Sequence, residues 1–358
     1  MADNTDPKIT WDIGTAYDFF VSLFILHYPD DYGLRPAWAS GMRQRLPARD
    51  REVLETFFEH MMVTIPLHWV HSLPDPKDSK IMLAAAKALS PVDRICALIG
   101  LDEDLPEAQE IIRNVIESGE WDDEDVKELN EIYKSAWGES KGVKKLKKKF
   151  EYWPKALEMS DDLLRALQTY YDVFFADEEQ RIEPAMEKGL AKAQEQADKL
   201  PLPELLEELS QGVRYQEDSF QGHEELILAP SFWGSPFLFY TDREPLIFLF
   251  GARPATESLV PGELVPDTLL SSINALSDPT RLRILRYLSS ESLTPTQLAN
   301  RLRLRTPTVL YHIKNLRSAG LVYVIPGSSK KQMHYQTRIE KLNQACELLK
   351  DFVKEQEE

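Results

Sequence analysis

The stretch from Thr294 to Arg338 reads TPTQLANRLRLRTPTVLYHIKNLRSAGLVYVIPGSSKKQMHYQTR and decides the fold of the C-terminal part of the chain. Two Thr-Pro pairs, at Thr294 and Thr306, predict two helix starts, because threonine caps free backbone N–H groups and proline lacks the N–H that would stay unpaired there. Gly320 can supply the left-handed residue that ends the second helix. Two β-rich runs separated by a turn follow. We therefore predict a winged helix-turn-helix, a module that reads duplex DNA.

The distribution of charge supports a DNA-binding module. Residues 280–341 hold twelve Lys and Arg against two Asp and Glu, a local charge of +10, whereas the whole chain carries −17 and its remainder therefore −27. The local field rather than the total charge governs docking on a phosphate backbone. We expect double-stranded DNA as the partner of this basic module.

The second helix of the stretch should present a polar face to DNA. Val309, Ile313 and Leu316 recur at helical spacing and form its core face, which leaves the opposite side for base edges and phosphates. Side chains near its start should lie deepest in the major groove, and the lysines of the hairpin tip should meet the backbone or the minor groove. The residues that we expect to contact DNA are Arg305, Thr306, Pro307, Thr308, Tyr311, His312, Lys314, Asn315, Ser328, Lys330 and Lys331.

Several fragments of this region, in order and at matching spacing, resemble the ArsR family of bacterial winged-helix repressors. They are Leu276–Leu285, the pair Leu298-Ala299, the pair Thr308-Val309, and His312–Val322. The resemblance covers residues 267–353. It implies a dimer, a partly palindromic operator, and a repressor that often releases DNA when a metal or another signal arrives.

The chain departs from the metal-sensing members of that family. The segment Leu293–Leu302 holds no cysteine, and Asp and His ligands at the terminal helices are not evident. The histidines His60, His68 and His71 lie near one another in sequence, but a zinc site would need further ligands, so ordinary core or surface histidines are the preferred interpretation. We therefore expect no metal and no cofactor.

The last helix carries an apolar seam typical of a coiled coil. Its apolar residues alternate at spacings of three and four, and a module this small cannot bury such a stripe fully by itself. The alternative is that the stripe packs within its own subunit. The residues that we expect at a homodimer contact, from the two terminal helices, are Leu269, Ile273, Ile339, Leu342, Cys346, Leu349 and Val353.

The whole chain is predicted to be mainly α-helical with small β elements. We expect a helical regulatory or dimerisation body at residues 1–205, a small β-rich segment packed on it at 206–252, a linker at 253–266, and the winged helix-turn-helix with its dimerisation helix at 267–358. Within the second part, Phe237–Tyr240 and Leu246–Phe250 look like a hairpin. The chain has 2 cysteines, no signal-like start and no run long enough to span a membrane, so we expect a cytoplasmic protein.

The role of the N-terminal body is open at this level. Its aromatic residues could line a pocket for a small apolar ligand, although an ordinary core is the favoured interpretation. Those aromatic residues include Trp11, Phe19, Phe20, Trp38, Trp69, Phe232 and Trp233. We find no motif for a nucleotide site or a hydrolase elbow and expect no catalytic residue. The sequence thus predicts a DNA-binding transcriptional regulator; the alternative is a protein-interaction winged helix on an enzymatic or ligand-binding body.

Overall fold

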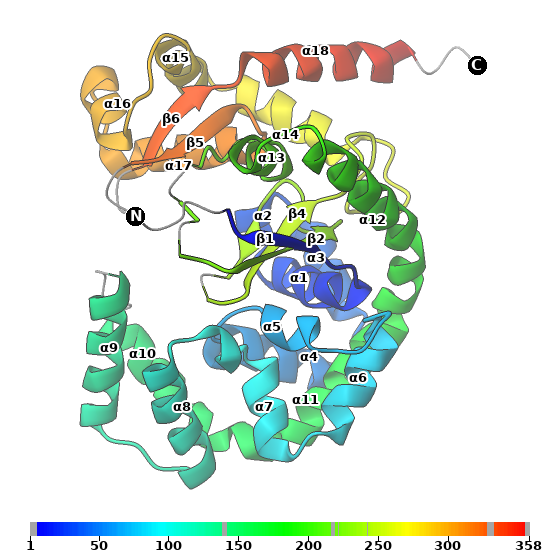
Figure 1. Ribbon diagram of the computed structural model, residues 1–358, viewed down its shortest axis with the longest axis vertical. Coiled ribbons are helices and arrows are strands. Elements are labelled where there is room, and N and C mark those ends of the chain that lie inside the picture. Colours follow the sequence, from blue (N-terminus) through cyan, green and yellow to red (C-terminus); the bar gives the residue numbers. More distant parts are fainter. Residues whose placement is uncertain are drawn as a thin grey trace.

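The fold is mainly α-helical with small β elements, as predicted. The computed structural model describes residues 6–137, 142–215, 219–220, 222–241, 243–327 and 333–354. Figure 1 places the winged helix-turn-helix at one end of the molecule, a helical body at the other end, and a small sheet between them. Among the described residues, no helix combines the length and the apolar character that crossing a membrane would require.

The helical body is built around α1 (Thr15–His27), which is buried along almost its whole length. Long segments later in the chain cover it: α11 (Ala156–Tyr170) continues through the π-helical turn Tyr171–Phe175 into α12 (Ala176–Ala197), which runs along one side of the molecule (Figure 1). The remaining helices are α2 (Pro29–Tyr32), α3 (Pro36–Gln44), α4 (Ala48–Thr56), α5 (Leu67–His71), α6 (Ser79–Ala88), α7 (Pro91–Leu98), α8 (Pro106–Ser118), α9 (Asp123–Trp137), α10 (Val143–Phe150) and α13 (Leu202–Leu209).

The four-stranded sheet has the order β1-β2-β4-β3. Its strands are β1 (Lys8–Trp11), β2 (Glu225–Ser231), β3 (Phe239–Tyr240) and β4 (Leu246–Gly251). The predicted hairpin is present as the antiparallel pair β3–β4, whereas β2 lies parallel to both β1 and β4. The short strand β1 lies in the part of the chain predicted to be mainly helical. It was not predicted, because its partner strand lies more than two hundred residues away and four residues give no local signal.

The two faces of the sheet belong to different hydrophobic clusters. Alternate residues such as Ile227 and Ile247 join the core around α1, while Leu228 and Phe248 pack with Leu205 of α13. This alternation follows from the strand period of two. Burial on both faces explains why β2 and β4 read as continuous apolar runs.

The winged helix-turn-helix has its own core. Its elements are α14 (Asp267–Leu276), α15 (Pro279–Leu288), α16 (Pro295–Leu302), α17 (Thr306–Ser318), β5 (Val322–Pro326), β6 (Met333–Thr337) and α18 (Ile339–Lys354). Thr294 and Gln297 form the capping box expected at the start of α16. Buried side chains such as Ile284, Leu298 and Ile313 meet in the centre of the module.

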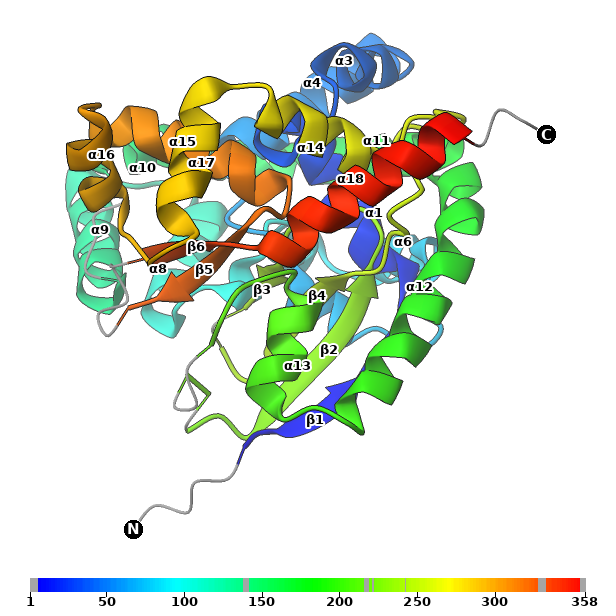
Figure 2. The same ribbon diagram turned by 90° about the horizontal axis from the view of Figure 1, so that it is seen from above.

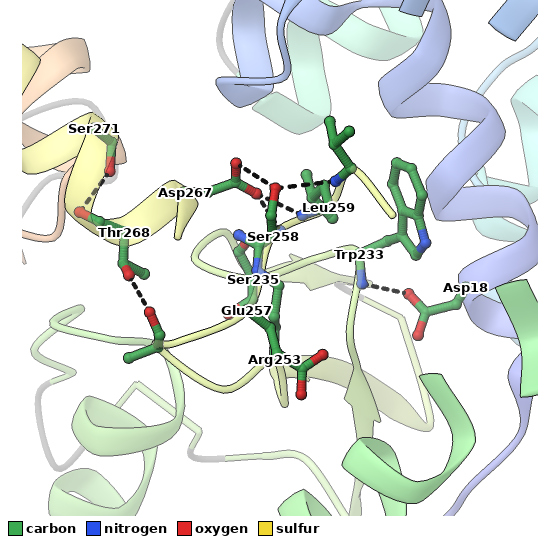
Figure 3. A network of polar contacts seen from close by, with 12 residues as sticks. Asp18, Trp233, Ser235, Arg253, Glu257, Ser258, Leu259, Asp267, Thr268 and Ser271 are labelled. Atoms are coloured by element: carbon green, nitrogen blue, oxygen red, sulfur yellow. Dashed lines mark hydrogen bonds and ion pairs between the residues drawn. The ribbon is translucent and has the colours of Figure 1, made fainter. Parts of the chain in front are cut away.

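The segment 253–266, predicted as a linker, contains no helix or strand but packs tightly on the body. Leu259 and Val260 are buried in the main core. Asp267, at the start of α14, accepts hydrogen bonds from Ser258 Oγ at 3.0 Å and from the backbone N–H of Leu259 at 2.6 Å, and it lies 3.2 Å from the guanidinium of Arg253 (Figure 3). The first helix of the winged module is therefore fixed to the body.

A second connection joins the wing to the segment after α13. Val213 bridges to Val324 in parallel, and the N–H of Arg214 donates to the carbonyl of Val324 at 2.9 Å. The guanidinium of Arg214 also stacks 3.6 Å from the ring centroid of Tyr323. Residues 212–214, expected to pack with the body, thus extend the β5–β6 hairpin instead.

Candidate nucleic-acid interface

Helix α17 is held by its inner face. Val309, Ile313 and Leu316 are at most 2% exposed, and they pack against residues of α16 such as Leu298. Arg303 closes α16 in the left-handed conformation with φ 55°, which turns the chain sharply into α17. The outer face of α17 is therefore fixed relative to the module by packing, as a recognition helix requires.

Five of the expected DNA-contacting residues are exposed on or next to α17. Tyr311 is 62% exposed, and it offers a ring and a hydroxyl group to a groove. The exposed set is Arg305, Pro307, Thr308, Tyr311 and Lys314. Thr306 and Asn315 are half-buried, and the amide of Asn315 donates to the carbonyl of Tyr311 at 2.8 Å.

His312 lies on the inner flank of α17 and not on its exposed face. Its side chain is only 12% exposed, and its Nδ1 is 3.8 Å from Oδ1 of Asp278, which caps α15 by accepting from the N–H groups of Thr280 and Arg281. Position 312 lies at the boundary between the polar face and the core face of the helix. Apolar spacing in the sequence locates this boundary only to within one residue. His312 is therefore not one of the proposed DNA contacts.

Ser328, Lys330 and Lys331 lie outside the described residues, so their predicted contacts stay predictions. The flanking strands pair in register from Val322–Thr337 to Pro326–Met333.

Part of the positive charge of the module serves the fold. Arg301 forms two hydrogen bonds with Glu291, and Arg338, only 4% exposed, donates to the carbonyl of Gln211. Other arginines are exposed, and no ion pair is found for them within the described part of the chain. These are Arg283, Arg286, Arg303, Arg305 and Arg317.

The structure brings a residue of the N-terminal body to the recognition helix. Lys314 of α17 forms an ion pair with Asp31 of α2. Both side chains remain about half exposed, at 47% and 57%. No sequence signal links two residues almost three hundred positions apart, so this contact was missed.

The expected dimer residues divide into a covered and an uncovered set. Leu269 is 1% exposed and belongs to the interior of its own subunit, where α14 packs against α15, α17 and α18. Leu342 is partly buried against the core of the winged module. The others are open to solvent: Ile273 at 42%, Ile339 at 52%, Leu349 at 41%, Val353 at 68%, and Cys346, which is also exposed.

The aromatic residues considered for a ligand pocket mostly fill the core. Phe19, Phe20, Phe232 and Trp233 are at most 3% exposed. His68 and His71 are hydrogen-bonded to Glu103 and Asp12, and the described residues contain no cluster of three or more potential metal ligands.

One cavity lies between the body and the module, and a smaller one lies within the body. The larger, about 670 Å³, lies between α12 and α18 and is lined by polar and charged side chains of both signs, such as Lys192 and Asp351. The smaller, about 370 Å³, lies between α1, α2 and β3 and has walls of aromatic, aliphatic and polar side chains.

Comparison with known proteins supports the same part of the chain. A family model described as a helix-turn-helix domain matches residues 276–325, which hold α15, α16, α17 and most of β5. A search of curated proteins found no match for the chain. The geometry and this match together show that residues 276–325 form a helix-turn-helix module of the DNA-binding type.

Proposed function

We propose that the protein is a sequence-specific transcriptional regulator of ArsR-like type that acts as a repressor and binds DNA as a homodimer. The observation that carries the proposal is the outer face of α17, where Thr308 and Tyr311 are exposed while the inner face is locked into a core. Such a helix can enter the major groove, and arginines beside it can meet phosphates. In this proposal the N-terminal body senses a small apolar ligand.

The homodimer is supported by the uncovered seam of α18. This helix has no buried residue, although it lies on its own subunit. Both views place it on the outer surface at the winged-helix end (Figures 1 and 2). Lys341 and Leu348 line the polar cavity toward the body, whereas Leu349 and Val353 do not line it and are 41% and 68% exposed. A second copy of the chain can cover them.

Footprinting on the DNA upstream of the protein's own gene tests the function directly. We expect a protected, partly palindromic site at physiological salt, bound more tightly than unrelated DNA by at least about a thousandfold. Folded protein that protects no site even at low salt would contradict the proposal. Equal affinity for all sequences would replace it with non-specific DNA binding.

Two substitutions on the module separate base reading from phosphate binding. Tyr311→Ala should lower the preference for the operator by roughly ten- to a hundredfold and leave binding to unrelated DNA nearly unchanged, because it removes a groove contact. Arg305→Gln should weaken binding to all DNA sequences alike, because it removes a phosphate contact. It should also reduce by about 1 the slope of the logarithm of affinity against the logarithm of salt concentration.

Titrations of operator and unrelated DNA at several salt concentrations measure both effects. Lys87→Gln, an exposed change of equal charge on α6, is the matched control and should alter neither. A uniform loss of affinity in Tyr311→Ala would show that Tyr311 does not read bases.

A further inference from the structure

The smaller cavity has the walls of a site for an aromatic molecule. Rings from three elements surround it: Phe24 of α1, Tyr32 of α2, and Phe239 and Tyr240 of β3. The ring of Tyr32 stacks on Phe239 with centroids 5.5 Å apart and an angle of 18°, and it meets Phe24 at 5.5 Å nearly edge to face. Tyr240 is 61% exposed at the rim.

The rest of the lining fits an uncharged ligand. Met62, Ile65 and Leu67 add aliphatic surface. The two carboxylates that line the cavity are already engaged: Glu103 by the ring and backbone N–H of His68, and Asp104 by the hydroxyl of Tyr133. The cavity, of about 370 Å³, also has the polar side chains of Thr64 and Thr241 in its lining, and aromatic and aliphatic walls with a few polar groups are typical of small-molecule sites.

The same helix that lines this cavity touches the recognition helix. Asp31, which pairs with Lys314, is the neighbour of Tyr32 in the four-residue helix α2. Burial and the charge of Asp31 raise the pKa of Tyr32 to about 12, and Arg317, one turn after Lys314, opposes this rise. The phenol of Tyr32 therefore stays neutral. Because Asp31 and Tyr32 are adjacent in one short helix, a displacement of Tyr32 would also move the carboxylate that pairs with Lys314.

We propose that a small uncharged aromatic molecule binds between Phe24, Tyr32, Phe239 and Tyr240, and that its binding displaces α2 and releases Lys314 for DNA. A ligand ring competes with Phe239 for the face of Tyr32, so Tyr32 leaves its stacked position when the site fills. Without ligand, the carboxylate of Asp31 pairs with the ammonium group of Lys314, which would otherwise contact a DNA phosphate. The regulatory half of this inference rests on the proposed DNA-binding function; the binding half does not.

Fluorescence of N-phenyl-1-naphthylamine, a neutral aromatic probe, tests the binding half on the full chain without DNA. We expect saturable binding at one site and roughly tenfold weaker binding in Phe239→Ala and in Tyr240→Ala, since each removes a ring from the wall. Tyr240 is exposed, so its variant should fold even if Phe239→Ala does not. Gln344→Ala, which changes the larger cavity, is the control. Absent binding, or equal binding in all variants, would overturn the site.

Operator titrations with and without the probe test the regulatory half. The probe should tighten DNA binding of the unsubstituted chain by roughly three- to tenfold, and DNA should tighten probe binding by the same factor, because coupling between two sites is reciprocal. Asp31→Asn should bind DNA more tightly without probe, show no further gain with it, and bind the probe as before.

Asp30→Asn is the matched control, because Asp30 is an exposed neighbour with no ion pair in the described ranges. It should keep the probe effect. If the probe changes the DNA affinity of Asp31→Asn and Asp30→Asn alike, the Asp31–Lys314 contact does not couple the cavity to DNA binding. The regulatory half of the proposal would then be wrong. A chain that binds the probe but no DNA would instead contradict the proposed function. The cavity would still be a binding site for an aromatic molecule.

Discussion

A chain carrying Leu349→Asp is expected to be monomeric and to bind its operator about a hundredfold more weakly than the unsubstituted chain. Leu349 is 41% exposed in the seam of α18, so the substitution costs its own subunit little. In a dimer it would bury an unpaired carboxylate between two copies, which costs several kcal/mol. A monomer engages one half-site and loses the gain from simultaneous binding, which is typically 10² to 10⁴.

Sedimentation velocity at micromolar concentration and gel shifts on whole and half operators measure these effects. The melting temperature of the unsubstituted chain should rise with protein concentration, and that of Leu349→Asp should not. Gln344→Asp adds the same charge on the side of α18 that faces the polar cavity, and it should leave the dimer intact. A dimer that survives both Leu349→Asp and Val353→Asp would exclude the seam as the interface.

The winged module could be predicted from sequence because its signals are local. Thr294, Pro295 and Gln297 specify the start of α16 within four residues, and the apolar spacing in α17 places its core face. Local signals fail at His312, because a shift of one residue along the helix separates a side chain that can reach a DNA groove from one that packs at the edge of the core. The packing of α15 against α17 makes that decision, and it depends on residues more than thirty positions away.

The connection between body and module could not be predicted, since its signals are non-local. Proline and glycine at 253–266 indicated a linker, yet Leu259 and Val260 find buried places in a core made by distant helices. The strand β1 and the ion pair Asp31–Lys314 have the same origin: each depends on a partner more than two hundred residues away. The composition of a segment indicates its local conformation, whereas its burial depends on tertiary contacts with residues far away in the sequence.

Replacing Asp18 by alanine is expected to lower the free energy of unfolding by about 3 kcal/mol. Asp18 is completely buried in α1, and its carboxylate accepts from Ser231 Oγ at 2.6 Å and from the N–H groups of Phe232 and Trp233 at 2.8 and 3.0 Å. These bonds fix the end of β2 on α1 (Figure 3 includes the bond to Trp233). Alanine leaves the buried donors without an acceptor, and each such group costs about 1–3 kcal/mol. Urea unfolding at pH 7 measures the loss.

The pH dependence of stability gives Asp18 a separate signature. Burial raises its pKa from 3.8 to about 6, so the folded state binds this proton more tightly than the unfolded state. The resulting stabilisation is fully present below pH 3.8 and is lost as the pH rises through about 6, a change of about 3 kcal/mol. Asp18→Asn keeps the shape but cannot titrate, so its stability relative to the unsubstituted chain should increase over this window. A constant difference between the two chains from pH 4 to 7 would show that the carboxylate is already ionised throughout, held so by its three donors.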